Sequence, residues 1–94
     1  MFINLNIGDY IIMMKLYEDP KIAKYNSNLK KIRILRMLTQ DELAKISGVN
    51  IKSLAIYEQM PEKLSSASVS TVYKLANALN CEIEDLLNKD TIND

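Results

Sequence analysis

The segment that most constrains the fold of this chain runs from Thr39 to Glu58 and predicts two short helices joined by a tight turn. Thr39 and Glu42 stand three residues apart, which is the spacing of a capping box at the start of a helix. Gly48 suits a turn position with a positive φ angle, where a Cβ atom would be strained. Asn50 can cap the helix that follows. The order of these signals, rather than any single residue, predicts the helical pair.

Apolar residues in this segment fall at spacings that place them inside the fold. Leu43, Ala44 and Ile46 form the expected buried side of the first helix, and Leu54 and Tyr57 form that of the second. The chain has 94 residues, a length that predicts one domain with a small hydrophobic core.

The rest of the chain extends the prediction to five helices. They are expected at residues 29–37, 40–46, 51–59, 69–79 and 83–88. Asn28 and Ser68 are suited to cap the first and the fourth, and Asn80 tolerates the left-handed conformation at a helix exit. Because Pro61 disfavours helical geometry at Met60, the third helix is expected to end there and a loop to follow as far as Ser68.

In this order the elements resemble the lambda-repressor and Cro type of helix-turn-helix domain, also called the xenobiotic-response-element family. Residues 29–58 resemble the helix-turn-helix region, and residues 68–87 resemble the two closing helices. The resemblance implies an all-α, five-helix domain at residues 28–88. It does not cover residues 1–27, which we interpret as an apolar extension, or the polar residues 89–94, which we expect to form a frayed tail. It implies a transcriptional regulator that binds double-stranded DNA, a small dimeric repressor, with no cofactor and no small-molecule ligand.

Composition excludes several classes of catalytic and metal site. The chain has no histidine and a single cysteine, Cys81. Zinc sites of the His/Cys kind, Ser-His or Cys-His catalysis and an intramolecular disulfide are therefore excluded, and we do not expect an enzyme. Asn4, Asn6 and Asp9 interrupt the first apolar residues, so we expect neither a signal peptide nor a membrane partner. The expected location is the cytoplasm.

Charge is distributed unevenly although the net charge is zero. Residues 28–63 hold seven Lys or Arg against four Asp or Glu, a net charge of +3. Residues 64–94 hold two against five, a net charge of −3. A positive half that contains the paired helices favours a DNA-binding protein with modest salt dependence.

The resemblance also implies which residues act. Arg33 and Glu58 match positions of an internal ion pair that would position the second helix of the pair, the recognition helix. Gln40 matches a residue that holds the DNA backbone. The full set that it places at DNA is Gln40, Asn50, Ile51, Lys52, Ser53, Ile56 and Lys63.

The recognition helix departs from the family pattern and leaves two interpretations. Polar side chains are common there, but this chain has Ile51 and Ile56. These side chains can contact thymine methyl groups, with Lys52 supplying polar discrimination. Alternatively, the apolar face binds a protein partner, as in an antitoxin or a phage-type partner protein, and DNA binding is weak or lost.

The N-terminal extension also allows two conformations. Residues 3–7 alternate apolar and polar side chains before Gly8 and Asp9, which favours a β-hairpin, but Asp9 could also cap a helix. The first helix is apolar almost all round and must be covered. We expect a homodimer interface formed by Ile3, Leu5, Ile7, Tyr10, Ile12, Ile34 and Leu35.

Overall fold

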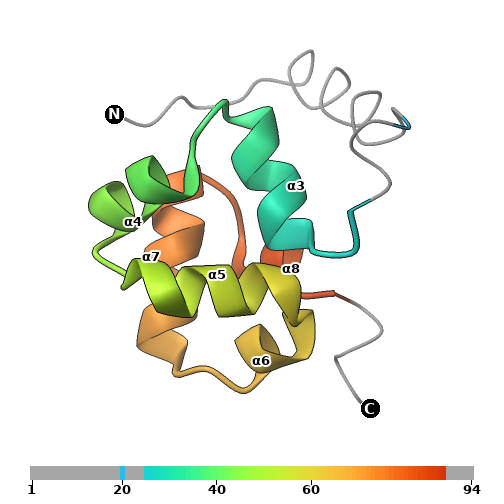
Figure 1. Ribbon diagram of the computed structural model, residues 1–94. Helices are drawn as coiled ribbons and strands as arrows, with labels where there is room; N and C mark the ends of the chain where they lie inside the picture. The colour runs from blue at the N-terminus through green and yellow to red at the C-terminus, as the bar shows by residue number, and fades with distance from the viewer. Residues whose placement is uncertain (1–19, 21–24, 89–94) are drawn as a thin grey trace.

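The computed structural model describes residue 20 and residues 25–88. Its helices, labelled in Figure 1, are α3 (Asn28–Leu35), α4 (Gln40–Ser47), α5 (Ile51–Gln59), α6 (Pro61–Ser65), α7 (Val69–Leu79) and α8 (Ile83–Leu86). The predicted hairpin and the interface residues Ile3, Leu5, Ile7, Tyr10 and Ile12 lie outside the described residues. Over residues 25–88 the all-α class is confirmed, and no helix there is long and apolar enough to cross a membrane.

The prediction of five helices and a loop after the third was wrong, because residues 61–65 form the additional helix α6. Pro61 ends α5 as expected, but it also occupies the first turn of α6, where its missing N–H is not needed. Pro61 is buried and Leu64 is almost fully buried, so the short helix is held by the core. It packs against α5.

The start of α3 also differs from the prediction, since Ser27 rather than Asn28 is the cap. The Ser27 hydroxyl accepts a hydrogen bond from the backbone N–H of Lys30 at 3.1 Å. Asn28 is the first helical residue, and its side-chain amide donates to the carbonyl of Leu87 at 3.1 Å. The backbone N–H of Asn28 donates to Oδ1 of Asn88 at 3.1 Å, so the start of α3 is tied to the segment after α8.

Helix α3 ends at Leu35, two residues earlier than predicted, because Met37 adopts a left-handed conformation with φ 60°. The N–H of Met37 then donates to Ile34 and that of Leu38 to Arg33, the closing pattern of a helix C-terminus. Two smaller differences are that α4 continues to Ser47 and that α8 ends at Leu86.

Most of the predicted caps are present. The Thr39 hydroxyl accepts from the N–H of Glu42, whose carboxylate in turn accepts from the N–H of Thr39, which completes the capping box. Gly48 has φ 77° and Asn80 has φ 53°, so both helices end in the left-handed conformation, as predicted. The hydroxyl of Ser68 caps α7.

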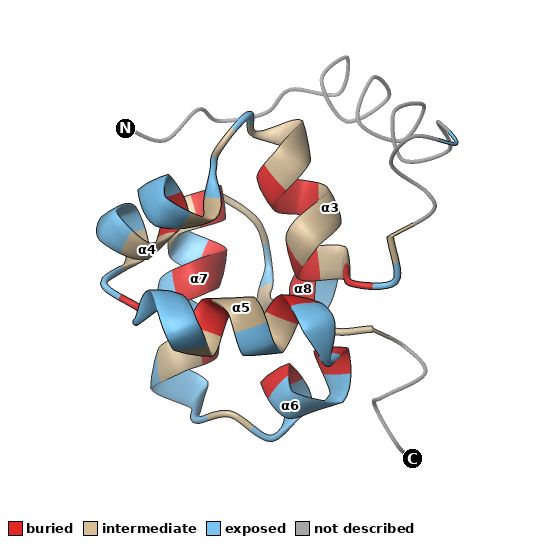
Figure 2. Cartoon of the chain, in the orientation of Figure 1, coloured by how far each residue is buried: buried red, intermediate tan, exposed pale blue. Residues whose placement is uncertain are grey.

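One hydrophobic core joins the helices, as the burial colours of Figure 2 show. Its fully or nearly buried members are Leu29, Ile32, Leu43, Val49, Leu54, Leu64, Val72, Leu75, Ala76, Leu79 and Leu86. Tyr57 and Ala44 are partly buried against it. The prediction that Ile46 is buried was wrong, because 51% of this residue is exposed on α4.

Candidate nucleic-acid interface

Helix α5 is positioned by three neighbouring helices. It packs against α4 across the turn at Gly48, against α6 and against α3. In Figure 1 it crosses the front of the domain, and its inner side carries the buried residues Leu54 and Glu58. Its start is fixed by Asn50, whose side-chain oxygen accepts from the N–H groups of Lys52 at 2.8 Å and Ser53 at 3.4 Å.

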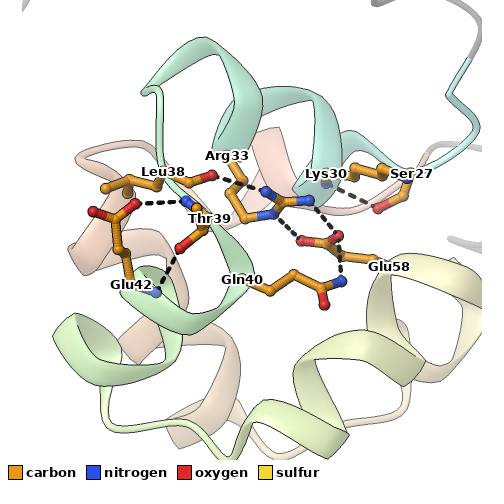
Figure 3. Close-up of polar contacts among 8 residues, drawn as sticks. All are labelled: Ser27, Lys30, Arg33, Leu38, Thr39, Gln40, Glu42 and Glu58. Atoms are coloured by element: carbon orange, nitrogen blue, oxygen red, sulfur yellow. Dashed lines mark hydrogen bonds and ion pairs between the residues drawn. The ribbon is translucent and has the colours of Figure 1, made fainter.

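A buried ion pair joins α3 to α5. The Nε of Arg33 donates to Oε2 of Glu58 at 2.6 Å, and Nη2 donates to Oε1 at 3.0 Å (Figure 3). The remaining guanidinium nitrogen, Nη1, donates to the carbonyl of Leu38 at 2.8 Å. Both residues are more than nine-tenths buried, at 9% and 7% exposure. The pair fixes the C-terminal half of α5 against α3 rather than presenting charge to a ligand.

Gln40 takes part in this same network. Its Nε2 donates to Oε1 of Glu58 at 3.0 Å, so the carboxylate receives hydrogen bonds from α3 and α4 together (Figure 3). A side-chain amide has two N–H groups, and one remains for a second acceptor. The half-buried Gln40 stands at the first position of α4, where backbone N–H groups and the helix dipole favour an anion.

The outward face of α5 is formed by two rows of side chains spaced four residues apart. Ile51 and Ala55 make one row, and Lys52 and Ile56 make the other. Ile51 is 39% exposed and Ile56 is 43% exposed, while Lys52 is exposed between them and Ala55 is half-buried.

One exposed polar residue on this face was missed by the sequence prediction. Gln59 follows Ile56 by three residues and Lys52 by seven, so it continues the same stripe towards the C-terminal end of α5. The spacing of Lys52, Ile56 and Gln59 along the helix could have identified Gln59 from the sequence. Gln59 lies about one turn beyond the last position inferred from the resemblance. Ser53, by contrast, is half-buried at the edge of the face.

Lys63 lies on α6 and is exposed. The serine hydroxyls near it are engaged within the protein. Ser66 donates to the carbonyl of Glu62 at 3.3 Å, and Ser68 caps α7. Of this group, Lys63 therefore provides the exposed cation next to the recognition helix.

Cys81 has the properties of a packed, unreactive thiol. Burial raises the pKa of Cys81 from an ordinary 9.0 to about 12, with a smaller contribution from the negative charge of Asp85. The thiol is therefore protonated at neutral pH and is a poor nucleophile. Over the part of the chain that the structure describes, no group of three or more Cys, Asp or Glu lies together as metal ligands would.

Comparison with known proteins agrees with this geometry. The sequence pattern of one family, described as helix-turn-helix and comprising lambda-repressor and Cro-like domains, matches residues 29–86. The match spans α3 to α8 and includes the buried network and the outward face of α5. Comparison with curated proteins and with solved structures gave no match.

Proposed function

The chain belongs to the helix-turn-helix family of DNA-binding transcription regulators, and on that premise we propose that it is a sequence-specific repressor that binds double-stranded DNA as a homodimer. The recognition helix α5 enters the major groove with its outward face, and α4 lies across the phosphate backbone. The residues proposed to contact DNA are Gln40, Asn50, Ile51, Lys52, Ser53, Ile56, Lys63 and the newly identified Gln59.

The observation that supports this proposal most directly is the exposure of one face of α5 while its opposite face is locked. Glu58 receives hydrogen bonds from Arg33 and Gln40, and Leu54 is fully buried. Lys52 and Ile56 are exposed on the other side. A helix held rigidly with its outer face free can enter a groove without reorganisation, which lowers the cost of ordering on binding.

The second N–H of Gln40 gives this network a role in DNA binding. While one N–H is bonded to Glu58, the other can donate to a phosphate oxygen at the start of α4. The position of Gln40 on the DNA backbone is then linked to the position of α5, because both depend on the carboxylate of Glu58.

A homodimer is supported by the apolar surface at the end of α3. Met37 is 89% exposed, and Ile34 and Leu35 are only half-buried. Pairing through this surface would bury it and would present two α5 helices to half-sites about 34 Å apart. Sedimentation velocity should give the mass of two chains. Met37→Asn removes the apolar group but tolerates the left-handed backbone, so it should shift the protein to a monomer.

A second candidate function is a protein-interaction module on the same fold. Exposed Ile51 and Ile56 favour it, because apolar side chains at a free helix surface also suit a protein partner. In this case α5 would bind protein and not the major groove.

The test is fluorescence anisotropy against duplexes selected from a randomised pool, measured from low to physiological salt. Lys52→Ala should weaken binding about tenfold and reduce the salt dependence, because it removes a cation from the DNA. Gln40→Ala should weaken binding without reducing the salt dependence, because it removes an uncharged contact to phosphate. Lys74→Ala, which changes an exposed lysine on α7, is the matched control and should bind like wild type. Binding no tighter than to random DNA, and unaffected by Lys52→Ala, would favour the protein-interaction module.

A further inference from the structure

Two polar side chains at the starts of α4 and α5 already hold hydrogen bonds within the protein. The side-chain oxygen of Asn50 accepts from two backbone N–H groups of α5. The amide nitrogen of Gln40 donates to Glu58. Bidentate recognition of adenine uses the oxygen and the nitrogen of one amide together, so the engaged oxygen of Asn50 and the engaged N–H of Gln40 disfavour that mode for these two residues.

The N-terminal and central part of the outward face of α5 is instead a hydrocarbon surface with one cation in it, and the polar Gln59 lies at its C-terminal end. Ile51 and Ile56 are 39% and 43% exposed, and Ala55 lies between them on the helix surface. Lys52 is one residue from Ile51 and four from Ile56, so its charge stands beside both isoleucines.

Only one group at the base edges of the major groove matches a hydrocarbon surface. This is the methyl group on C5 of thymine, and the other groups exposed there are donors or acceptors of hydrogen bonds. Cytosine methylated at C5 presents the same group at the same position. An isoleucine set against an unmethylated cytosine or a purine would instead cover a polar edge without satisfying it.

We propose that α5 selects its DNA site by packing Ile51 and Ile56 against C5-methyl groups of pyrimidines, with Lys52 fixing the register through an adjacent guanine or phosphate. This inference rests on the proposed function, since it identifies the base group that the same helix binds. Specificity then comes mainly from apolar contact, and Lys52 supplies the charged contact of this surface to a base edge or the backbone.

The charge distribution favours DNA over a protein as the occupant of this face. Residues 28–63, which include α3 to α5, carry a net charge of +3, and Lys52 lies within the apolar surface itself. An apolar protein surface packed against α5 would have to desolvate that ammonium group, whereas DNA phosphates neutralise it.

The test removes the methyl group and nothing else. Two selections are run in parallel from randomised duplex pools that contain either thymine or uracil. The best thymine duplex is then resynthesised with uracil at each conserved thymine. Wild type should lose about fourfold in affinity for each contacted methyl group, which corresponds to the transfer of one buried carbon from water. Equal affinity for the thymine and uracil duplexes, together with equal affinity for cytosine and 5-methylcytosine duplexes, would overturn the inference.

The two sources of the methyl group are separated by a second pair of duplexes. Cytosine and 5-methylcytosine are compared at the same position, where they differ only by the methyl group. If affinity rises when cytosine is methylated and falls when thymine is replaced by uracil, recognition is assigned to the methyl group itself. A gain on methylation alone assigns it to methylated cytosine, and a loss on uracil substitution alone assigns it to thymine.

Variants of α5 link the effect to the two isoleucines. Ile51→Ala and Ile56→Ala should each bind the thymine duplex more weakly but discriminate less between thymine and uracil. Ile46→Ala is the matched control, because Ile46 is 51% exposed but lies on α4, and it should keep the full wild-type discrimination. Discrimination that survives in both α5 variants would contradict the assignment. Failure of wild type to bind any selected duplex in the presence of competitor would instead refute the proposed function itself.

Discussion

The guanidinium of Arg33 on α3 and the carboxylate of Glu58 on α5 are joined by two hydrogen bonds of 2.6 and 3.0 Å in the interior of the domain. Each charged group also has a further partner, the carbonyl of Leu38 for the guanidinium and the amide of Gln40 for the carboxylate. Because this pair is satisfied away from water, it fixes α5 against both α3 and α4.

Removing one partner should therefore destabilise the domain strongly. Glu58→Ala leaves the Arg33 guanidinium buried without its carboxylate, and we expect the free energy of unfolding to fall by about 3–5 kcal/mol. Urea unfolding followed by circular dichroism measures this change. Asp41→Ala is the control, because Asp41 and Lys45 form an exposed ion pair whose atoms are 3.6 Å apart. This variant should lower the free energy of unfolding by less than about 1 kcal/mol. A loss for Glu58→Ala as small as that of the control would show that the pair does not hold α5.

Two residues in the left-handed conformation should respond in opposite directions. Gly48 has φ 77°, and no atom lies within 4 Å of an added Cβ. Gly48→Ala should therefore destabilise through the backbone alone, by about 1 kcal/mol. Met37→Gly should stabilise by about 0.5 kcal/mol, because it relieves a strained residue with φ 60° that is almost fully exposed.

Thermal unfolding, at a dilution where sedimentation gives a monomer, measures both changes. Met60→Gly is the matched control for the second variant, since Met60 has φ −128° and gains nothing from glycine. Stabilisation of that control to the same extent would point to a cause other than the left-handed backbone.

The asparagines that join the two ends of the domain should contribute to stability. Asn88 accepts from the N–H of Asn28 at 3.1 Å and donates to the carbonyl of Asn26. Asn88→Ala should lower the free energy of unfolding by about 1 kcal/mol, because it removes one partly buried and one exposed hydrogen bond. Asn77→Ala, on the exposed side of α7, should change stability by less than about 0.5 kcal/mol. Equal effects of the two variants in chemical unfolding would argue against a specific tie.

Cys81 should make stability depend on pH in the alkaline range. Its pKa is about 12 in the folded protein, against an ordinary 9.0, because burial disfavours the thiolate. The unfolded chain therefore loses its thiol proton at lower pH than the folded chain does. The contribution to stability is complete below pH 9 and is lost as the pH rises towards about 12.

Urea unfolding of wild type and Cys81→Ala at several pH values tests this linkage. The free energy of unfolding of wild type should fall more steeply with pH above pH 9 than that of the variant. If the free energies of unfolding of the two proteins changed in parallel with pH, and the native thiol reacted rapidly with a disulfide reagent at neutral pH, burial would not protect the thiol.

Local signals explain which elements could be predicted from sequence. The bounds of α5 were predicted at both ends, because Asn50 caps its start and Pro61 terminates it. The bounds of α7 were also predicted, because Ser68 caps its start and Asn80 adopts the left-handed conformation at its end. In each of these cases the determinant lies within two residues of the helix end.

The wrong predictions concern features that depend on distant parts of the chain. Helix α6 forms because Leu64 enters the core, and the cap at Ser27 prevails because Asn28 is engaged by Leu87 and Asn88. The bond from Gln40 to Glu58 spans α4 and α5 and has no local signal. Pairings of this kind require the packed structure.

The most direct test of the central claim is an NMR spectrum of isoleucine methyl groups recorded with and without a selected duplex. If α5 lies in the major groove, the methyl signals of Ile51 and Ile56 should shift on addition of DNA and show contacts to base protons. The signal of Ile32, which is buried at 2% exposure, should stay in place. Specific binding with unchanged Ile51 and Ile56 signals would contradict the account, because the DNA would then be held by a different surface.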